Sequence, residues 1–240
     1  MSALRKIILN IFICLVILGS AVTSWAIPTL QLDIGGGTYD WSTETIVSSG
    51  NPFTLYAYLI PNNNNTLSDD YYISMALIPK VGPQGANLGS FTFAGLPINV
   101  TGDMTYGIPP LETYVAKDPG DLPSHDIFET YFYESGFKFS SSNQTTIYNT
   151  QDDPGGPVGS GTGMYYASFL LNTASLNPEY VIHFDLYNTK IKSGGDIDVT
   201  QFAPFSHDAE SHYNVPEPMT LILLGLGLLG LGSMRRKFKA

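Results

Sequence analysis

The sequence predicts an all-β fold, a two-sheet antiparallel β-sandwich with jelly-roll topology as one option, between two targeting segments. Apolar residues come in short runs separated by clusters of Gly, Pro, Asn, Asp and Ser, which is typical of antiparallel strands and turns. All fifteen tyrosines and most phenylalanines lie between the two ends, and aromatic residues favour strands. Outside the ends, no long 3.6-residue periodicity indicates a helix, and no fixed-period repeat indicates a solenoid.

The N-terminus has the organisation of a secretory signal peptide. A basic pair precedes an apolar run at residues 7–19, and Ser24 and Ala26 place small residues at the minus-three and minus-one positions of a cleavage site. We therefore expect a signal peptide over residues 1–26, cut by signal peptidase between Ala26 and Ile27.

The charge of the chain becomes distinctive once the ends are set aside. Residues 27–214 hold five lysines, no arginine and twenty carboxylates, a net charge near −15. Such a surface disfavours nucleic acid and favours divalent cations or neutral polymers, although acidity also keeps an exported protein soluble. The one cysteine, Cys14, leaves with the signal peptide, so no disulfide is expected.

A single domain over residues 27–205 is expected to hold the strands. Its short apolar runs predict strands, in chain order, at residues 30–34, 53–60, 71–78, 90–94, 130–140, 145–148, 164–171, 180–187 and 197–202.

Three of these strands indicate how the faces of the sheets are covered. In residues 180–187 one face is wholly apolar and the other mixed, as in a sandwich strand. Residues 53–60 are apolar almost throughout, which favours cover on both sides. Ser135-Gly136 interrupts the run at 130–140, which predicts either a bulge or a tight hairpin. The four asparagines after Pro61 and the Pro/Gly-rich residues 152–157 are expected to be loops outside any ladder.

The C-terminus combines Val215-Pro216-Glu217-Pro218, an uncharged run at 219–234 and a basic end, Arg235-Arg236-Lys237, within residues 235–240. As a helix, the sixteen uncharged residues span roughly 24 Å, somewhat less than the ~30 Å core of a bilayer. We expect a single transmembrane helix with its basic end in the cytoplasm and the extended Pro-Glu-Pro segment accessible outside.

This tail resembles the PEP-CTERM sorting signal of exported bacterial proteins. The resemblance implies processing by an exosortase-type transpeptidase, an inner-membrane intermediate held by the C-terminal helix, and then the cell surface or extracellular matrix of a Gram-negative bacterium. Leu30-Gln31-Leu32-Asp33, Thr38-Tyr39-Asp40 and Leu122-Pro123-Ser124-His125 are also similar to the exported β domains called choice-of-anchor proteins, the N group among them.

No catalytic motif is present, so we expect no enzyme. The sequence lacks a nucleophile elbow, a phosphate-binding loop, a dinucleotide fingerprint and a zinc-binding His-Glu-x-x-His. A glycan hydrolase remains an alternative and would need two carboxylates roughly 5–10 Å apart across a cleft.

No cofactor is expected, with Ca²⁺ as the alternative. Asp196 and Asp198, and the pairs at 69–70 and 152–153, could supply oxygen ligands, although aspartate beside glycine is more often a turn former. The segment His207-Asp208-Ala209-Glu210-Ser211-His212 is dense in potential metal ligands. Its place before the sorting tail favours instead a solvated linker over residues 206–214.

Glycan contact is the remaining sharp hypothesis, through Trp41 or through Tyr56 and Tyr58, which share one strand face. Such aromatic pairs, including Tyr131 and Tyr133, are more often packed in a core. We expect a structural or adhesive protein of an exopolysaccharide or biofilm matrix. The alternatives are a polysaccharide-binding module, which needs exposed aromatic side chains gathered on one face, and the hydrolase.

Overall fold

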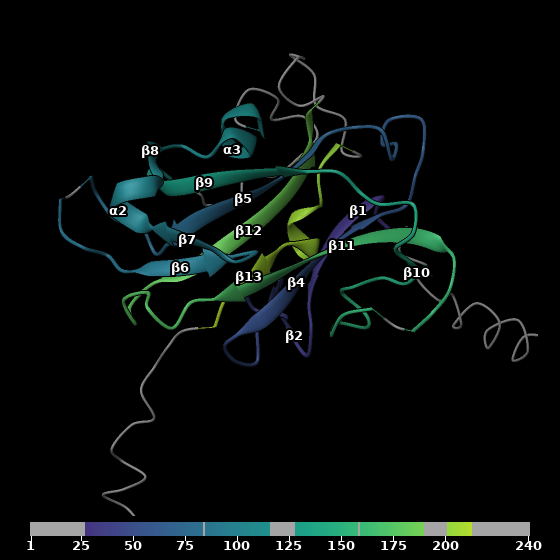
Figure 1. Cartoon of the computed structure of the whole chain (residues 1–240), viewed down its shortest axis with the longest axis horizontal. Coiled ribbons are helices and arrows are strands. Elements are labelled where there is room, and N and C mark those ends of the chain that lie inside the picture. Colours follow the sequence, from purple (N-terminus) through teal and green to yellow (C-terminus); the bar gives the residue numbers. More distant parts are fainter. Residues whose placement is uncertain (1–26, 84, 116–127, 158, 190–200, 213–240) are drawn as a thin grey trace, which may run out of the picture.

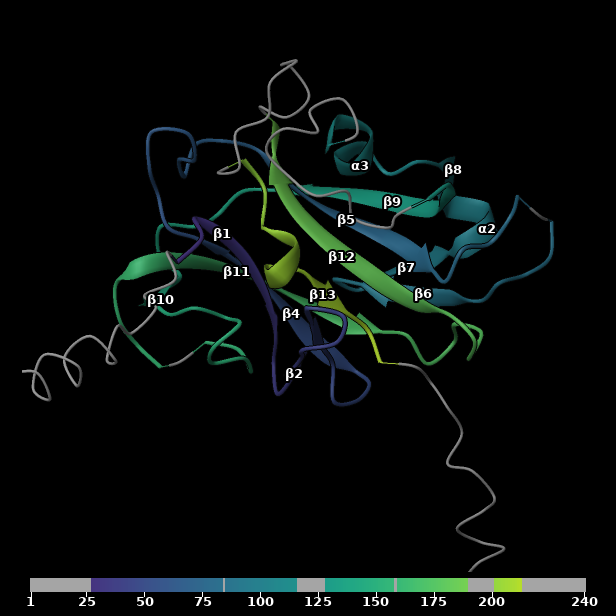
Figure 2. The same ribbon diagram turned by 180° about the vertical axis from the view of Figure 1, so that it is seen from behind.

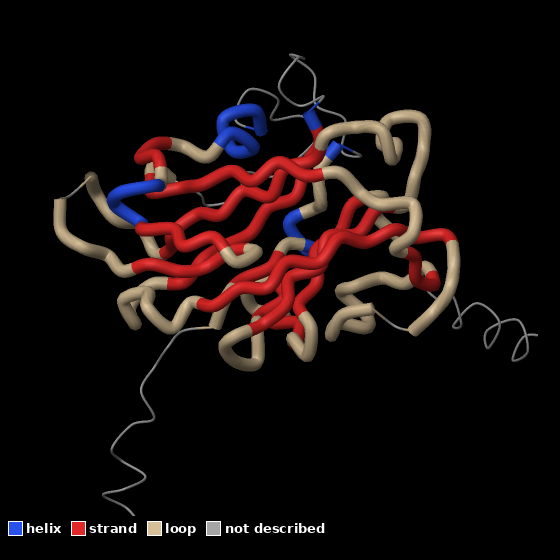
Figure 3. The backbone as a smooth tube through the Cα atoms, viewed as in Figure 1, coloured by secondary structure: helices blue, strands red, loops and turns tan. Residues whose placement is uncertain are grey.

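The computed structural model describes residues 27–83, 85–115, 128–157, 159–189 and 201–212. These residues form a two-sheet β structure with a few short helical segments (Figures 1 and 3). The expected signal peptide, the sorting tail with its transmembrane helix, and Asp196 and Asp198 lie outside the described residues. Within the described ranges, no helix has the length and apolar character needed to cross a membrane.

One sheet has six strands and contains the N-terminal strand of the domain. Its order is β1-β4-β11-β6-β7, with β10 also paired to β11, and every pairing is antiparallel. The strands are β1 (Leu30–Ile34), β4 (Phe53–Leu59), β6 (Ser90–Phe93), β7 (Leu96–Asn99), β10 (Gln144–Thr146) and β11 (Gly163–Asn172).

The second sheet has seven strands in the order β2-β3-β13-β12-β5-β9-β8. Its strands are β2 (Thr38–Asp40), β3 (Thr45–Val47), β5 (Tyr71–Ile78), β8 (Thr105–Gly107), β9 (Thr130–Phe137), β12 (Val181–Asn188) and β13 (Ala209–Glu210). The β3–β13 pair is parallel, and the other pairs are antiparallel. The helical segments are α2 (Val100–Asp103), α3 (Pro110–Val115) and η3 (Phe205–His207).

The core lies between the sheets and is built from alternate residues of the longest strands. β4 and β12 show this most clearly, since Leu55 and Phe184 are fully buried in the same apolar cluster and Phe53 meets Phe184 edge to face at 6.2 Å. Alternation of side chains across a strand directs these residues to one face. The predicted sandwich is confirmed, and the expected apolar face of residues 180–187 is its core face.

Eight of the expected strands correspond to observed ones, and those at 30–34 and 71–78 have the observed bounds. The expected strand at 197–202 falls largely outside the described residues, and Phe202 makes an isolated bridge to Tyr187.

The prediction of a bulge or a tight hairpin within residues 130–140 is wrong. Ser135 and Gly136 continue the ladder of β9 opposite β5, because Gly136 leaves room for the Tyr72 ring, which a β-carbon would approach to 3.3 Å.

The expected linker at 206–214 is also wrong for its described part. His207 ends η3, β13 joins the second sheet between β12 and β3, and Ser211 Oγ accepts a hydrogen bond from Ile182 N at 2.8 Å. Figure 2 shows β13 lying beside β12. His207, Asp208, Ala209 and Ser211 are buried, so the domain extends to the edge of the sorting tail.

The Pro/Gly-rich segment at 152–157 is a loop, as expected, and two β1 side chains hold the chain leading through it. The buried Asp33 carboxylate accepts hydrogen bonds from Gly155 N and Gly156 N at 3.0 and 2.8 Å, and from the Tyr148 hydroxyl at 2.9 Å. Gln31 Oε1 accepts from Thr150 N at 2.9 Å. The loop is thereby attached to the sheet by polar contacts rather than by a strand ladder.

Candidate functional site

An open groove lies along the β2–β3 hairpin at the edge of the second sheet. It has a volume of about 640 Å³. Its lining combines two aromatic rings with mostly short polar side chains and comprises Thr38, Tyr39, Asp40, Trp41, Ser42, Val47, Ser48, Ser49 and His212.

Trp41 is the most conspicuous side chain of this groove. It is 71% exposed, although a tryptophan ring is strongly apolar. The Tyr39 ring contacts it edge to face, with 4.8 Å between the ring centroids. The Tyr39 ring is itself held in place, because its hydroxyl accepts a hydrogen bond from Gln151 Nε2 at 3.0 Å. Burial, followed by the charge of Glu44, raises the pKa of Tyr39 to about 12, so its hydroxyl stays neutral at physiological pH.

The polar groups beside Trp41 are suited to hydrogen bonding with a neutral ligand. Asp40 Oδ1 accepts from the Ser42 hydroxyl at 2.6 Å and from Ser42 N at 2.8 Å, and these bonds lower the pKa of Asp40. Asp40 therefore stays ionised and acts as an acceptor. Ser48 Oγ accepts from His212 N at 2.8 Å, which ties the end of the domain to the groove.

The other two predicted glycan residues have different environments. Tyr58 is fully buried, packed between Tyr56, Tyr148 and Tyr166, so the prediction that it contacts a glycan is wrong. Tyr56 is half-buried in the same tyrosine cluster and is absent from the lining of the groove. Alternation placed Tyr56 and Tyr58 on one face correctly, but the segment carrying Tyr148 covers part of that face. The core alternative holds for Tyr131, which is buried against Tyr106.

A second group of polar side chains crosses the outer face of the second sheet. Strand pairing places Glu134 of β9 opposite Ser74 of β5, and Ser74 opposite Asp185 of β12. Asp208 directly precedes β13 and continues the register of that strand opposite Asp185. His183 lies two residues from Asp185 on the same face, opposite Glu210. The topology thus gathers residues from four strands that are far apart in sequence.

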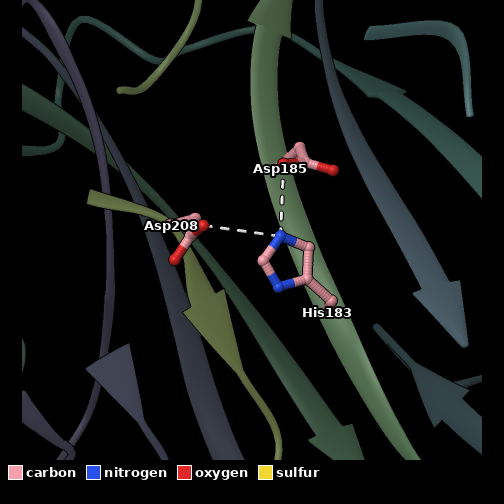
Figure 4. A group of neighbouring side chains, drawn as sticks. All are labelled: His183, Asp185 and Asp208. Carbon is pink, nitrogen blue, oxygen red and sulfur yellow. Dashed lines mark ion pairs between the residues drawn. The ribbon is translucent and has the colours of Figure 1, made fainter. Parts of the chain in front are cut away.

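His183, Asp185 and Asp208 form a compact cluster at the centre of this row (Figure 4). His183 Nε2 lies between the two carboxylates, 3.4 Å from Asp185 Oδ1 and 3.5 Å from Asp208 Oδ2. The three residues are 4%, 2% and 1% exposed respectively. Glu210 lies opposite His183, and burial raises the pKa of its carboxyl, with His183 opposing the rise and Asp208 adding to it. One imidazole and two carboxylates are a suitable ligand set for a divalent cation.

Three of the alternative calcium candidates that the structure describes, Asp69, Asp70 and Asp152, have protein partners. Asp69 Oδ2 accepts from Thr66 N at 2.8 Å, and Asp70 forms an exposed ion pair with Lys138 at 2.8 Å. Asp152 Oδ2 accepts from Asn149 Nδ2 at 2.9 Å. The contacts of Asp69 and Asp152 each span three residues, as a turn-forming role requires, whereas the Asp70 pair joins distant segments.

The buried His207 links η3 to the loop that supports the groove. Its Nε2 lies 2.6 Å from Asn149 Oδ1, and its Nδ1 lies 2.8 Å from Ser206 Oγ. The neutral ring satisfies both contacts when Nε2–H donates to Asn149 and Nδ1 accepts from Ser206. Burial lowers the pKa of His207 to about 4, and the charge of Asp152 opposes this effect.

We expect His207 to make folding sensitive to mild acid. Because its pKa falls from 6.5 unfolded to about 4 folded, the unfolded chain binds more protons between these values. The stabilisation is complete above pH 6.5 and is lost as the pH falls toward 4, by on the order of 3 kcal/mol. Urea unfolding at pH 7, 6, 5 and 4 should show a steeper loss for the wild type than for His207→Gln. The exposed His212→Gln should keep the wild-type slope, and equal slopes for wild type and His207→Gln would contradict the assignment.

Sequence reasoning missed the buried cluster because its members lie in two separate segments. Alternation in residues 180–187 already places His183 and Asp185 on one face, and this signal could have identified two of the three residues. Asp208 is a potential ligand by sequence, but its position before the sorting tail favoured a linker.

Comparison with known proteins identifies the C-terminal tail. Residues 214–237 match the family model of the PEP-CTERM protein-sorting motif. No curated protein and no solved structure matches the chain. The motif indicates an exported protein that is directed to the cell surface and processed by an exosortase. It covers residues that the structure does not describe, and the similarity to choice-of-anchor proteins remains a prediction.

Proposed function

We propose that this exported domain is an adhesive structural protein of an extracellular polysaccharide matrix, and that it binds polysaccharide through the groove at Trp41. The observation that carries the proposal is the 71% exposed Trp41 ring, held edge to face by Tyr39 and flanked by Asp40, Ser42 and Ser49. The exposed ring offers apolar area to a ligand, and covering this area on binding would recover the free energy that its contact with water costs.

The chemistry of the groove favours a sugar as its ligand. The apolar C–H face of a sugar ring can stack on the indole ring, while its hydroxyl groups exchange hydrogen bonds with the neighbouring carboxylate and serine hydroxyls. The groove is open rather than enclosed, as contact with a long polymer requires. The excess of carboxylates in residues 27–214 favours a neutral polysaccharide over a polyanionic one.

The hydrolase alternative has less support. Among the described residues that line the groove, Asp40 alone carries a carboxylate. Acid/base hydrolysis of a glycosidic bond ordinarily uses two such groups on opposite sides of the bond. We therefore favour binding without turnover.

The sorting motif complements this proposal. Processing by an exosortase would release the domain from its membrane intermediate toward the surface of a Gram-negative cell, where it would meet exopolysaccharide. A protein that binds the polymer there would contribute to the cohesion of a biofilm. The groove and the tail are separate features, so the two functions can be tested independently.

Replacing Trp41 by alanine tests the binding proposal. We expect Trp41→Ala to weaken polysaccharide binding roughly 5- to 150-fold, because stacking of one aromatic ring contributes about 1–3 kcal/mol. The melting temperature should stay within about 2 °C of the wild type, since the ring is largely exposed. Glycan-array screening followed by titration with the best neutral polysaccharide measures both effects, and Trp41→Phe should retain part of the affinity.

Leu96→Ala is the matched control, because Leu96 is 61% exposed and lies on β7, outside the groove. It should bind like the wild type. A glycan array without any binder, or equal affinities for wild type and Trp41→Ala, would reject the groove as a polysaccharide site. Release of sugar from a bound polymer would instead favour the hydrolase.

A further inference from the structure

The cluster of His183, Asp185 and Asp208 presents a charge problem that the groove does not explain. Asp185 and Asp208 are cross-strand neighbours and almost completely buried. Like charges directly opposite in a sheet are destabilising, and burying a carboxylate requires a compensating positive charge. Within the cluster itself, one imidazolium would balance only one of them. A divalent cation balances both and leaves the imidazole neutral, as a metal ligand must be.

The distances also favour a cation between these groups. A charge-assisted N–H···O hydrogen bond is about 2.7–2.9 Å long, and a single N–H cannot point at two carboxylates. The observed Nε2–oxygen separations are 3.4 and 3.5 Å. Two ligands bound at about 2.1 Å to one tetrahedral ion lie roughly 3.4 Å apart. The three ligand atoms lie within 4.8 Å of one another. Small side-chain movements would therefore bring the two carboxylate oxygens to the roughly 3.4 Å separation of a tetrahedral site.

An independent observation comes from the polar atoms around the cluster. Asp185 Oδ2 and Ser74 Oγ are buried without a hydrogen-bond partner among the residues described. Ser74 is 0% exposed, and strand pairing sets it directly beside Asp185 on the same face. Buried hydroxyl and carboxylate oxygens are rarely left unsatisfied in proteins. The Ser74 hydroxyl is in register to orient the carboxylate or to complete the coordination.

We propose that His183, Asp185 and Asp208 bind one divalent transition-metal cation on the outer face of the second sheet, with Ser74 as a supporting group. Zn²⁺ fits best, because it accepts imidazole together with carboxylates in a four-coordinate site. Ca²⁺ fits less well, because it prefers six to eight oxygen ligands. The site differs from the Asp196 and Asp198 alternative suggested by sequence and from the polysaccharide groove.

The position of this site gives the ion a structural role. Asp208 lies immediately before β13, a strand of two residues that is the last strand described before the sorting motif. His183 and Asp185 belong to the central strand β12. The ion therefore fastens the C-terminal end of the domain to its core. Without the ion, residues 206–212 should detach from the second sheet more often. The segment would then behave more like the solvated linker expected from sequence.

Metal titration of the full chain, purified in detergent and stripped with chelator, tests the proposal. We expect one Zn²⁺ per chain by elemental analysis and calorimetry. At a hundredfold excess over Kd, the melting temperature should rise by about 5–10 °C. Hydrogen exchange of residues 206–212 should slow on zinc addition. Co²⁺ should give the strong visible absorption of tetrahedral coordination, whereas Ca²⁺ should leave melting unchanged.

His183→Gln and Asp208→Asn should each weaken zinc binding by more than about 100-fold, the upper range for loss of an outer-shell partner. His212→Gln, which removes an exposed imidazole, and Asp70→Asn, which removes an exposed carboxylate, should bind like the wild type. If the wild-type chain takes up no stoichiometric zinc and neither melting nor exchange changes, the cluster is an imidazolium held by carboxylates and the proposal is overturned. This result does not depend on whether the variants fold. Loss of zinc uptake in His212→Gln with retention in His183→Gln would overturn it equally.

Discussion

Asp33→Ala should lower the free energy of unfolding by about 3–5 kcal/mol. The substitution leaves the Tyr148 hydroxyl and the amides of Gly155 and Gly156 buried or half-buried without their acceptor. Each buried polar group left unsatisfied costs about 1–3 kcal/mol. Urea unfolding of the purified protein at pH 7 measures the loss.

The same substitution should also weaken polysaccharide binding, although Asp33 is absent from the lining of the groove. The loop that Asp33 holds carries Gln151, which donates to the Tyr39 hydroxyl, and Tyr39 in turn supports Trp41. Releasing the loop removes this support. Asp153→Ala is the control, because Asp153 is an exposed residue of the same loop. It should change stability by less than about 0.5 kcal/mol. Similar stabilities for the two variants would show that Asp33 does not hold the loop.

Gly89→Ala should destabilise the domain by at least about 3 kcal/mol. Gly89 has a φ of +95°, and a β-carbon there would lie 2.5 Å from Ser175 O and 2.7 Å from Asn177 N. Both are backbone atoms that cannot move without disturbing the bridge between Gly89 and Leu176. We therefore expect a large fall in melting temperature, or loss of soluble protein.

Gly95→Ala separates the two causes of this effect. Gly95 has a φ of +83° in the turn between β6 and β7, but no atom lies within 4 Å of the position that a β-carbon would take there. Conformational strain alone should cost about 1 kcal/mol. If both variants lose the same stability, backbone crowding at Gly89 contributes nothing. A larger loss for Gly89→Ala assigns the difference to crowding.

The long strands could be predicted from sequence because their patterns are local. Residues 30–34 and 71–78 contain enough apolar and aromatic residues to define a strand within its own length. The short strands β2, β3, β7, β8 and β13 were missed, since two to four residues carry too little pattern. They are strands because a neighbouring strand supplies hydrogen bonds. β13, for example, lies between β12 and β3.

The two candidate sites differ in how far sequence could lead to them. Trp41 was a glycan candidate from sequence, and the structure added its exposure and the support from Tyr39 and Gln151. The cluster at His183 was not predicted, because its carboxylates lie in segments 23 residues apart along the chain. Likewise, nothing in the local pattern distinguishes the buried Tyr58 from the half-buried Tyr56.

By itself, the sequence determined the all-β class, the longest strands, the acidic charge and the sorting tail, because each depends on composition or on residues adjacent in the chain. The tertiary structure decided which polar residues are buried together, which tyrosines are covered, and that residues 206–212 belong to the domain. These properties depend on contacts between distant segments. The free energy of such contacts comes from burial and strand pairing, which a local pattern does not contain.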